Sequence, residues 1–164
     1  MFSKRLLLAA VAASSCLFPA LANASTAVGN LAVTMTIAST CTVTTSGVLA
    51  FGSVGLLTTA VSATGSFGVT CTNTTPYNVG LNQGANGASV TARQMKAASS
   101  AALVNYSIFS NVAATTNWGN TAGSWVAGVG TGASQTMNVY GVVPVQTTPA
   151  PDSYTDTVTI TINY

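Results

Sequence analysis

Two segments near opposite ends of this chain alternate between apolar and polar residues, and they constrain the fold more than any other feature. The first covers residues 31–38 (LAVTMTIA), and the second covers residues 156–164 (DTVTITINY). Alternation with a period of two is typical of a β-strand that buries one face. The second strand ends at Tyr164, and neither a charge nor a proline near that residue protects its edge. We therefore predict that the front segment of one molecule completes the sheet of another.

The first 24 residues have the pattern of a cleavable export signal. Lys4 and Arg5 form a positive start, an apolar stretch follows from 6 to 21, and Ala22-Asn23-Ala24 matches an A-x-A cleavage site. The alternative is a transmembrane helix, which the polar residues and the proline inside the stretch disfavour. We expect export through the periplasm and a mature chain that begins at Ser25.

The mature chain carries almost no charge. Only Arg93, Lys96, Asp152 and Asp156 remain after removal of the signal, so two cations balance two anions. A chain with few charges and a net charge of zero tends to associate. Two cations cannot form a phosphate-binding surface, which excludes nucleic acid and anionic membranes as electrostatic partners.

Cysteine usage agrees with export. Cys16 belongs to the signal, which leaves Cys41 and Cys71 as a pair bound for an oxidising compartment, so we expect one disulfide. Such a crosslink restricts the unfolded chain by roughly 3 to 4 kcal/mol on the entropy model. Metal binding is the alternative, but the chain has no His or Glu to complete a ligand set.

Strand-like runs recur at short intervals along the mature chain and predict one all-β domain, a sandwich or a barrel. A helical turn at 97–102 is a weak alternative within this pattern. The runs are rich in Val, Ile, Thr, Tyr and Phe and are bounded by Gly, Asn, Ser and Pro: Cys41 to Thr45, Val48 to Phe51, Ser66 to Thr72, Tyr77 to Leu81, Leu103 to Phe109, Thr136 to Val143 and Tyr154 to Tyr164.

The residues needed for catalysis are missing. Without His and Glu, no Ser-His-Asp or Cys-His arrangement can form, and the chain's carboxylate side chains are limited to Asp152 and Asp156. A glycosidase pair is one interpretation of these two residues, but we expect solvated turn residues instead. We predict that the protein is not an enzyme and that it uses no cofactor, catalytic site or metal.

Three weaker motifs have ordinary interpretations. The glycines of 128–133 match a loose dinucleotide pattern, but a strand is expected after them, so we predict a loop. Glycosylation sequons at Asn73 and Asn105 are chance matches in a chain rich in Thr and Ser. Trp118 and Trp125 could stack on a sugar, although a core or loop-anchoring role is more frequent.

The order and spacing of several motifs resemble the spore coat U domain family, which includes the pilin subunits of archaic chaperone–usher pili. The likeness covers essentially the whole mature chain and rests on these residues together: Cys41, Phe51-Gly52, 65–71 (GSFGVTC), 77–81 (YNVGL), Leu103 with Tyr106, Trp118-Gly119, 139–141 (VYG) and 154–164. The resemblance implies an all-β, incomplete immunoglobulin-like β-sandwich that an N-terminal donor strand from a neighbouring subunit completes. It also implies a periplasmic chaperone and an outer-membrane usher as partners.

The resemblance divides the chain into a signal peptide (1–24), an N-terminal donor segment (25–38) and a pilin domain (39–164). The alternating apolar residues of the donor segment are its expected contacts: Leu31, Val33, Met35 and Ile37. Those of the C-terminal strand are expected to bind the chaperone: Val158, Ile160, Ile162 and Tyr164. Head-to-tail contacts between identical subunits do not close and therefore build filaments.

The single-domain length is similar to that of a major shaft subunit, and the resemblance implies a role in adhesion and biofilm formation at the cell surface. A secreted spore or cell coat protein of the same fold is the second hypothesis. An eight-stranded outer-membrane barrel is the third, although the few aromatic residues and the detached front strand disfavour it. An enzyme or a lectin comes last.

Overall fold

The computed structural model describes residues 24–44 and 47–164, and this part of the chain is all β. The predicted signal peptide therefore lies outside the described residues, apart from Ala24. The chain divides into two units, Met1–Met35 and Thr36–Tyr164, and all the strands belong to the second. Over the described ranges, no helix is long and apolar enough to cross a membrane.

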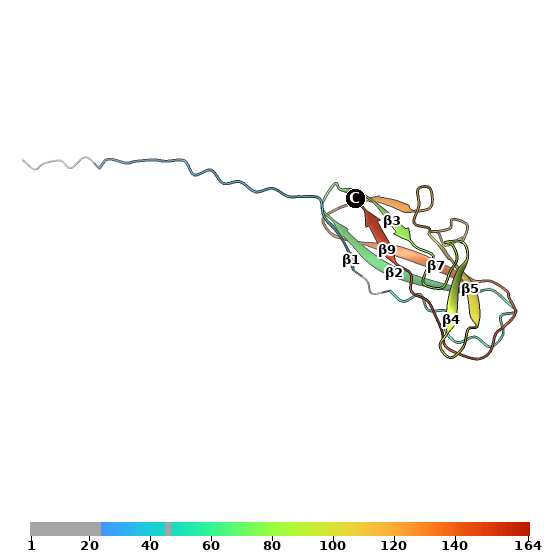
Figure 1. The fold of residues 1–164 in the computed structure, drawn as a ribbon. Coiled ribbons are helices and arrows are strands. Elements are labelled where there is room, and N and C mark those ends of the chain that lie inside the picture. Colours follow the sequence, from blue (N-terminus) through green and yellow to red (C-terminus); the bar gives the residue numbers. More distant parts are fainter. Residues whose placement is uncertain (1–23, 45–46) are drawn as a thin grey trace, which may run out of the picture. The chain divides into compact units, whose positions relative to one another are not determined.

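Within the described residues, nine strands form two antiparallel sheets, so the predicted all-β sandwich is confirmed. Figure 1 shows how these strands are arranged. One sheet has the order β1-β2-β7-β5-β4-β8, and the other has the order β6-β3-β9. The strands are β1 (Cys41–Thr44), β2 (Val61–Cys71), β3 (Pro76–Leu81), β4 (Arg93–Ala97), β5 (Leu103–Phe109), β6 (Val126–Val129), β7 (Ser134–Val143), β8 (Tyr154–Thr155) and β9 (Ile160–Asn163).

The core lies between the two sheets and is centred on Trp118. This side chain is almost completely buried, and its ring packs 5.8 Å from the ring of Phe67 on β2. The indole Nε1 of Trp118 donates a hydrogen bond of 2.9 Å to the carbonyl oxygen of Val79 on β3. A buried indole needs such an acceptor, because an unpaired N–H in an apolar core is costly. The predicted core role of Trp118 is confirmed.

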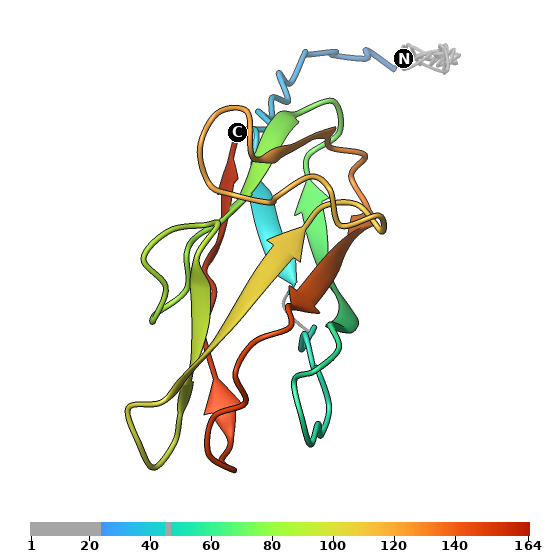
Figure 2. The ribbon, with the colours of Figure 1, turned by 90° about the vertical axis from the view of Figure 1, so that its right-hand side faces the viewer.

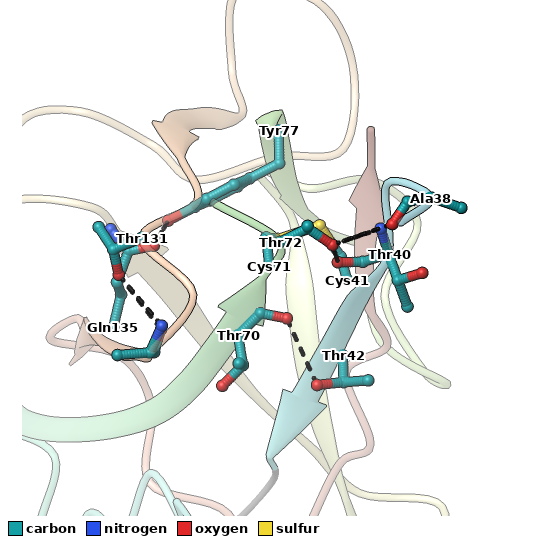
Figure 3. Close-up of a disulfide and its surroundings, with 11 residues drawn as sticks. Ala38, Thr40, Cys41, Thr42, Thr70, Cys71, Thr72, Tyr77, Thr131 and Gln135 are labelled. Atoms are coloured by element: carbon teal, nitrogen blue, oxygen red, sulfur yellow. Dashed lines mark hydrogen bonds between the residues drawn. A yellow bond between two sulfur atoms is a disulfide. The ribbon is translucent and has the colours of Figure 1, made fainter. Parts of the chain in front are cut away.

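The predicted disulfide joins the first two strands. Cys41 and Cys71 are directly opposite each other in the β1–β2 ladder and are bonded to each other. Figure 3 shows that Thr72, which follows β2, also holds the chain just before β1. Its hydroxyl oxygen accepts a hydrogen bond from the N–H of Thr40 at 2.9 Å and donates to the carbonyl of Ala38 at 3.3 Å. The chain is thus attached to the sandwich from Ala38 onward.

Two predicted strands are different in the structure. The segment from Val48 to Phe51 has no assigned secondary structure and belongs to neither sheet. The predicted strand from Tyr154 to Tyr164 is two short strands, β8 beside β4 and β9 beside β3. Between them the chain leaves one sheet and enters the other, and the carbonyl of Thr159 already accepts a hydrogen bond of 3.1 Å from the N–H of Asn82, which follows β3. Residue Thr45 of the first predicted run lies outside the described residues.

Two other strands were not predicted. The β4 sequence RQMKA contains three long polar residues, so it lacks a clear alternating pattern. It ends at Ala97, where a helical turn over 97–102 was a weak alternative, and the structure has a bend without a helix there. The β6 sequence VAGV overlaps the glycines of 128–133, which the sequence predicts as a loop. Both strands form because a neighbouring strand supplies their hydrogen bonds, which a local pattern does not reveal.

Candidate functional site

An open cleft of about 350 Å³ lies along one side of the sandwich and is the candidate functional site. One wall, which we call the first rim, is the segment from Gly47 to Phe51; the other wall, the second rim, runs from Asp156 to Ile160. The floor is made of core side chains that reach the cleft from both sheets: Phe67, Leu81, Met95, Tyr106, Ile108 and Val139. The cleft is therefore an opening into the hydrophobic core.

Both rims offer unpaired backbone. The strand β9 pairs with β3 on one side and is the last strand of its sheet, so its other edge is free. In Figure 2 the chain can be followed from β8 near the bottom up to β9 beside the C-terminus. The first rim is not part of either ladder. A sheet edge next to an apolar cleft is a template for an additional strand.

A glycine on β7 allows the first rim to lie close to the sheet. A Cβ atom at Gly141 would come within 2.7 Å of Leu49 and 2.8 Å of Phe51. Leu49 and Phe51 therefore pack against the core across a surface that has no side chain at this position. Sequence reasoning assigned a strand here and did not find the rim, because its contacts come from β2 and β7, far along the chain.

The predicted C-terminal contact residues lie on and beside β9. Val158, Ile160 and Ile162 are partly buried and pack against the core, while Thr157, Thr159 and Thr161 between them are exposed. The predicted alternation of this segment is therefore present. Tyr164 lies beyond the strand and is 61% exposed. Val158 and Ile160 also line the cleft, so they stand at the position where an added strand would meet β9.

The predicted donor residues are exposed and form no strand. Leu31, Val33, Met35 and Ile37 are 87%, 84%, 83% and 72% exposed, respectively. The backbone of residues 24–40 has no assigned secondary structure. A β-strand needs a partner edge for its N–H and C=O groups, and none of the strands in this molecule pairs with the segment. Its pairing with a second molecule stays a prediction.

Arg93 on β4 is completely buried although it carries a charge. The guanidinium of Arg93 donates four hydrogen bonds of 2.7–2.9 Å, all to carbonyl oxygens: those of Leu81, Asn82, Val90 and Trp118. Burial lowers the pKa of Arg93, and the attraction of Tyr106 and Asp156 opposes that effect. A buried charge is tolerated only where its donors are satisfied. The sequence RQMKA has no alternating pattern that would have shown Arg93 to be buried.

Asp156 corrects the expectation that both aspartates are solvated turn residues. Its carboxylate is half-buried and accepts hydrogen bonds from the Tyr106 hydroxyl (2.6 Å), the Ala85 N–H (2.8 Å) and the Asn86 amide (3.1 Å). Burial, together with the hydrogen bond to Asp156, raises the pKa of Tyr106 well above its ordinary value, so the phenol stays protonated and donates. These partners are at least 50 positions away from Asp156 in the sequence, so no local motif predicts the contacts.

Asp152 behaves as predicted for a turn residue. It lies at the surface and accepts hydrogen bonds from the N–H and the hydroxyl of Ser99, at 3.0 and 2.6 Å. These bonds lower the pKa of Asp152. Within residues 24–44 and 47–164, no group of three His, Cys, Asp or Glu side chains could hold a metal ion. The cleft itself is lined mainly by apolar side chains.

The two sheets and the open cleft between their edges define an immunoglobulin-like β-sandwich. The chain belongs to the Spore Coat Protein U domain family, whose model matches residues 27–161. It is 31% identical to Protein U of Myxococcus xanthus over 170 residues, and the match covers 95% of each chain. Membership of this structural family confirms the prediction that the chain is not an enzyme.

The structure is also similar to a chain in the crystal structure of the CsuC–CsuE chaperone–tip adhesion subunit pre-assembly complex from the archaic chaperone–usher Csu pili of Acinetobacter baumannii. The TM-score is 0.59 at 27% sequence identity, over 79% of this chain. The match covers 40% of that chain, so this protein spans less than half of its solved relative. The predicted family and fold class are thereby confirmed.

Proposed function

We propose that this protein is a subunit of an archaic chaperone–usher pilus, and that it polymerises when the donor segment of one subunit fills the cleft of the next. The observation that carries the proposal is the open cleft, which has an apolar floor and the free edge of β9 as part of its boundary. The same chain carries an exposed segment with four alternating apolar side chains. The cleft lacks a strand that would cover its apolar floor, and the exposed segment lacks a sheet edge with which to pair.

The energetics favour insertion of the donor segment of one subunit into the cleft of the next. Burying Leu31, Val33, Met35 and Ile37 is worth roughly 6 to 12 kcal/mol before ordering costs, at about 1.5 to 3 kcal/mol for each side chain. The added strand also satisfies the main-chain groups along the edge of β9. Because donor and cleft are different surfaces of one subunit, the contact is heterologous and extends into a filament of identical subunits.

The partners follow from the same exposed surfaces. A subunit with an open core and a free edge would aggregate before assembly, so it needs a periplasmic chaperone that covers the cleft. The solved relative is part of a chaperone–subunit complex, which supports a chaperone as a partner. In this proposal the chaperone binds the C-terminal strand residues Val158, Ile160, Ile162 and Tyr164. We assign export through an outer-membrane usher to the cell surface, where the filament acts in adhesion and biofilm formation. We also propose that the protein is the major subunit of the shaft.

The proposal is tested by placing a charge in the joint. Val33→Asp or Met35→Asp would bury an unpaired carboxylate in the cleft, at a cost of several kcal/mol. We expect filaments to disappear from sheared cell-surface material under the electron microscope, while the subunit still accumulates in the periplasm. Val28→Asp is the matched control, because Val28 is 92% exposed and lies outside the alternating set. Normal filaments from a subunit with both Val33 and Met35 changed would refute the donor assignment.

A secreted coat protein is the second candidate. Protein U matches this chain over 95% of both lengths, whereas the Csu chain is matched over only part of its own length, and this difference favours the coat hypothesis. The two candidates differ in the form of the assembled material. A coat protein would be recovered as a layer on the cell or spore, without filaments that shear from the surface.

A further inference from the structure

Tyr106 on β5 contacts both rims of the cleft. Its ring packs edge-on against the ring of Phe51, with centroids 6.2 Å apart and planes at 64°. Its hydroxyl donates a 2.6 Å hydrogen bond to a carboxylate oxygen of Asp156. Phe51 is the last residue of the first rim, and Asp156 is the first residue of the second rim. One side chain in the floor therefore links the two rims at the same end of the cleft.

A loop is shaped around the carboxylate of Asp156. Besides Tyr106, the carboxylate binds the Ala85 N–H at 2.8 Å and the Asn86 side-chain amide at 3.1 Å. Gly84 has a φ of +81°, and a Cβ atom at this position would collide with the carboxylate of Asp156. The loop thus follows the carboxylate closely on one side, while Tyr106 holds it on the other. The point at which the chain leaves β8 for β9 is fixed by this carboxylate.

The buried positive charge of Arg93 lies close to Tyr106 and Asp156. Arg93 is directly opposite Tyr106 in the β4–β5 ladder, and the attraction of Asp156 acts on its guanidinium. Four charged residues remain in the mature chain, and two of them are at this end of the cleft. Burying charge costs free energy even when hydrogen bonds satisfy it. A chain that otherwise has few charges therefore places two of them beside the residue that contacts both rims.

We propose that Tyr106 and Asp156 are positioning residues for donor capture, because they hold the two rims of the cleft at the separation that one added strand requires. A strand between two neighbours needs about 4.8 Å on each side. The inference rests on the proposed function, and it adds the residues that determine whether the cleft is ready to accept a strand. Without the link, the second rim loses its fixed position relative to the first.

The test measures capture of a fluorescent peptide of residues 27–38 by the full mature chain. All proteins carry Val33→Asp, so that their own segments do not compete. Fluorescence anisotropy gives the affinity for Asp156→Asn, Tyr106→Phe and the double variant, with Asp152→Asn as the matched control. We expect each single variant to bind the peptide about tenfold more weakly or worse, since a hydrogen bond to a charged group is lost. The double variant should bind no more weakly than the singles, and the control should match the parent.

Peptide substitutions separate positioning from a general loss of stability. Each of Leu31, Val33, Met35 and Ile37 in the peptide is changed to Ala and is measured against the parent protein and Asp156→Asn. If Asp156 sets the rims at one end, its effect couples to one end residue of the donor, Leu31 or Ile37, and leaves the two middle residues uncoupled. A protein that is merely less stable would change all four affinities by the same factor.

The outcomes distinguish the two proposals. If the parent binds the peptide and the Asp156 and Tyr106 variants bind equally well, the positioning role is wrong while the proposed function stands. An equal loss for all four peptide positions also overturns the positioning role. If the parent protein binds the native peptide no better than a scrambled peptide, the proposed function fails and the inference fails with it. Tyr106→Phe keeps the ring on Phe51, so near-ultraviolet circular dichroism can check that this variant is folded.

Discussion

Completion of the fold by a donor peptide should raise its thermal stability strongly. The protein for this test lacks residues 25–37 and retains Ala38, whose carbonyl is bonded to Thr72. The ligand is a peptide of residues 27–38, which restores the removed segment from outside. The perturbation leaves the sandwich unchanged and supplies the alternating side chains that the cleft lacks.

The magnitude follows from linkage between binding and stability. At a peptide concentration one hundred times Kd, the native state gains about 2.7 kcal/mol. For a domain of this size each kcal/mol raises Tm by about 3 to 5 °C, so we expect an increase of about 10 °C. Removing the two methyl groups of Val33 in the peptide costs about 0.8 kcal/mol for each group, which weakens binding roughly tenfold. Thr34→Ala, on the opposite face, is the matched control and should have little effect.

Differential scanning fluorimetry or calorimetry measures the shift with the native peptide, the Val33→Ala peptide and a scrambled peptide of equal composition. The scrambled peptide should give no shift, because it does not place apolar side chains on one face. Equal melting with all three peptides and without peptide would refute the reasoning. It would mean that the fold is already complete and that the cleft does not accept a strand.

Three further predictions concern covalent and titrating groups. Mass spectrometry of non-reduced peptides should find Cys41 bonded to Cys71 within one subunit, and reduction should lower subunit stability by roughly 3 to 4 kcal/mol without cutting the filament; a peptide joining two subunits would contradict this. The pKa of Tyr106 is raised, so its stabilising effect is complete below the ordinary tyrosine pKa and is lost as the pH rises through the folded value; Tyr106→Phe should remove the last tyrosine to ionise in an absorbance titration. Because Ser99 lowers the pKa of Asp152, the stabilising effect of Asp152 is present above the unfolded pKa and is lost as the pH falls through the folded one. Ser99→Ala should raise the pKa of Asp152 in a carboxyl NMR titration, and an unchanged value would show that other groups cause the shift.

The sequence by itself determined the elements whose information is local. The alternation of Val158, Ile160 and Ile162 specified which face packs on the core, because side chains in a strand alternate wherever the strand is placed. The buried Trp118 and the bonded pair of cysteines were also predictable, since residue type and compartment decide them. The class of protein and the absence of catalytic chemistry followed from composition and motif order.

Only the tertiary structure decided how the cleft is built. The segment from Val48 to Phe51 has strand-like residues but forms a rim, because it joins neither of the two ladders of the described residues. Asp156 looked like a solvated turn residue, yet its three partners lie 50, 70 and 71 positions away in the sequence. Burial and hydrogen bonding of a charged group depend on which distant segments the fold brings together. A single sequence lists the residues of such a cluster but does not show that they are in contact.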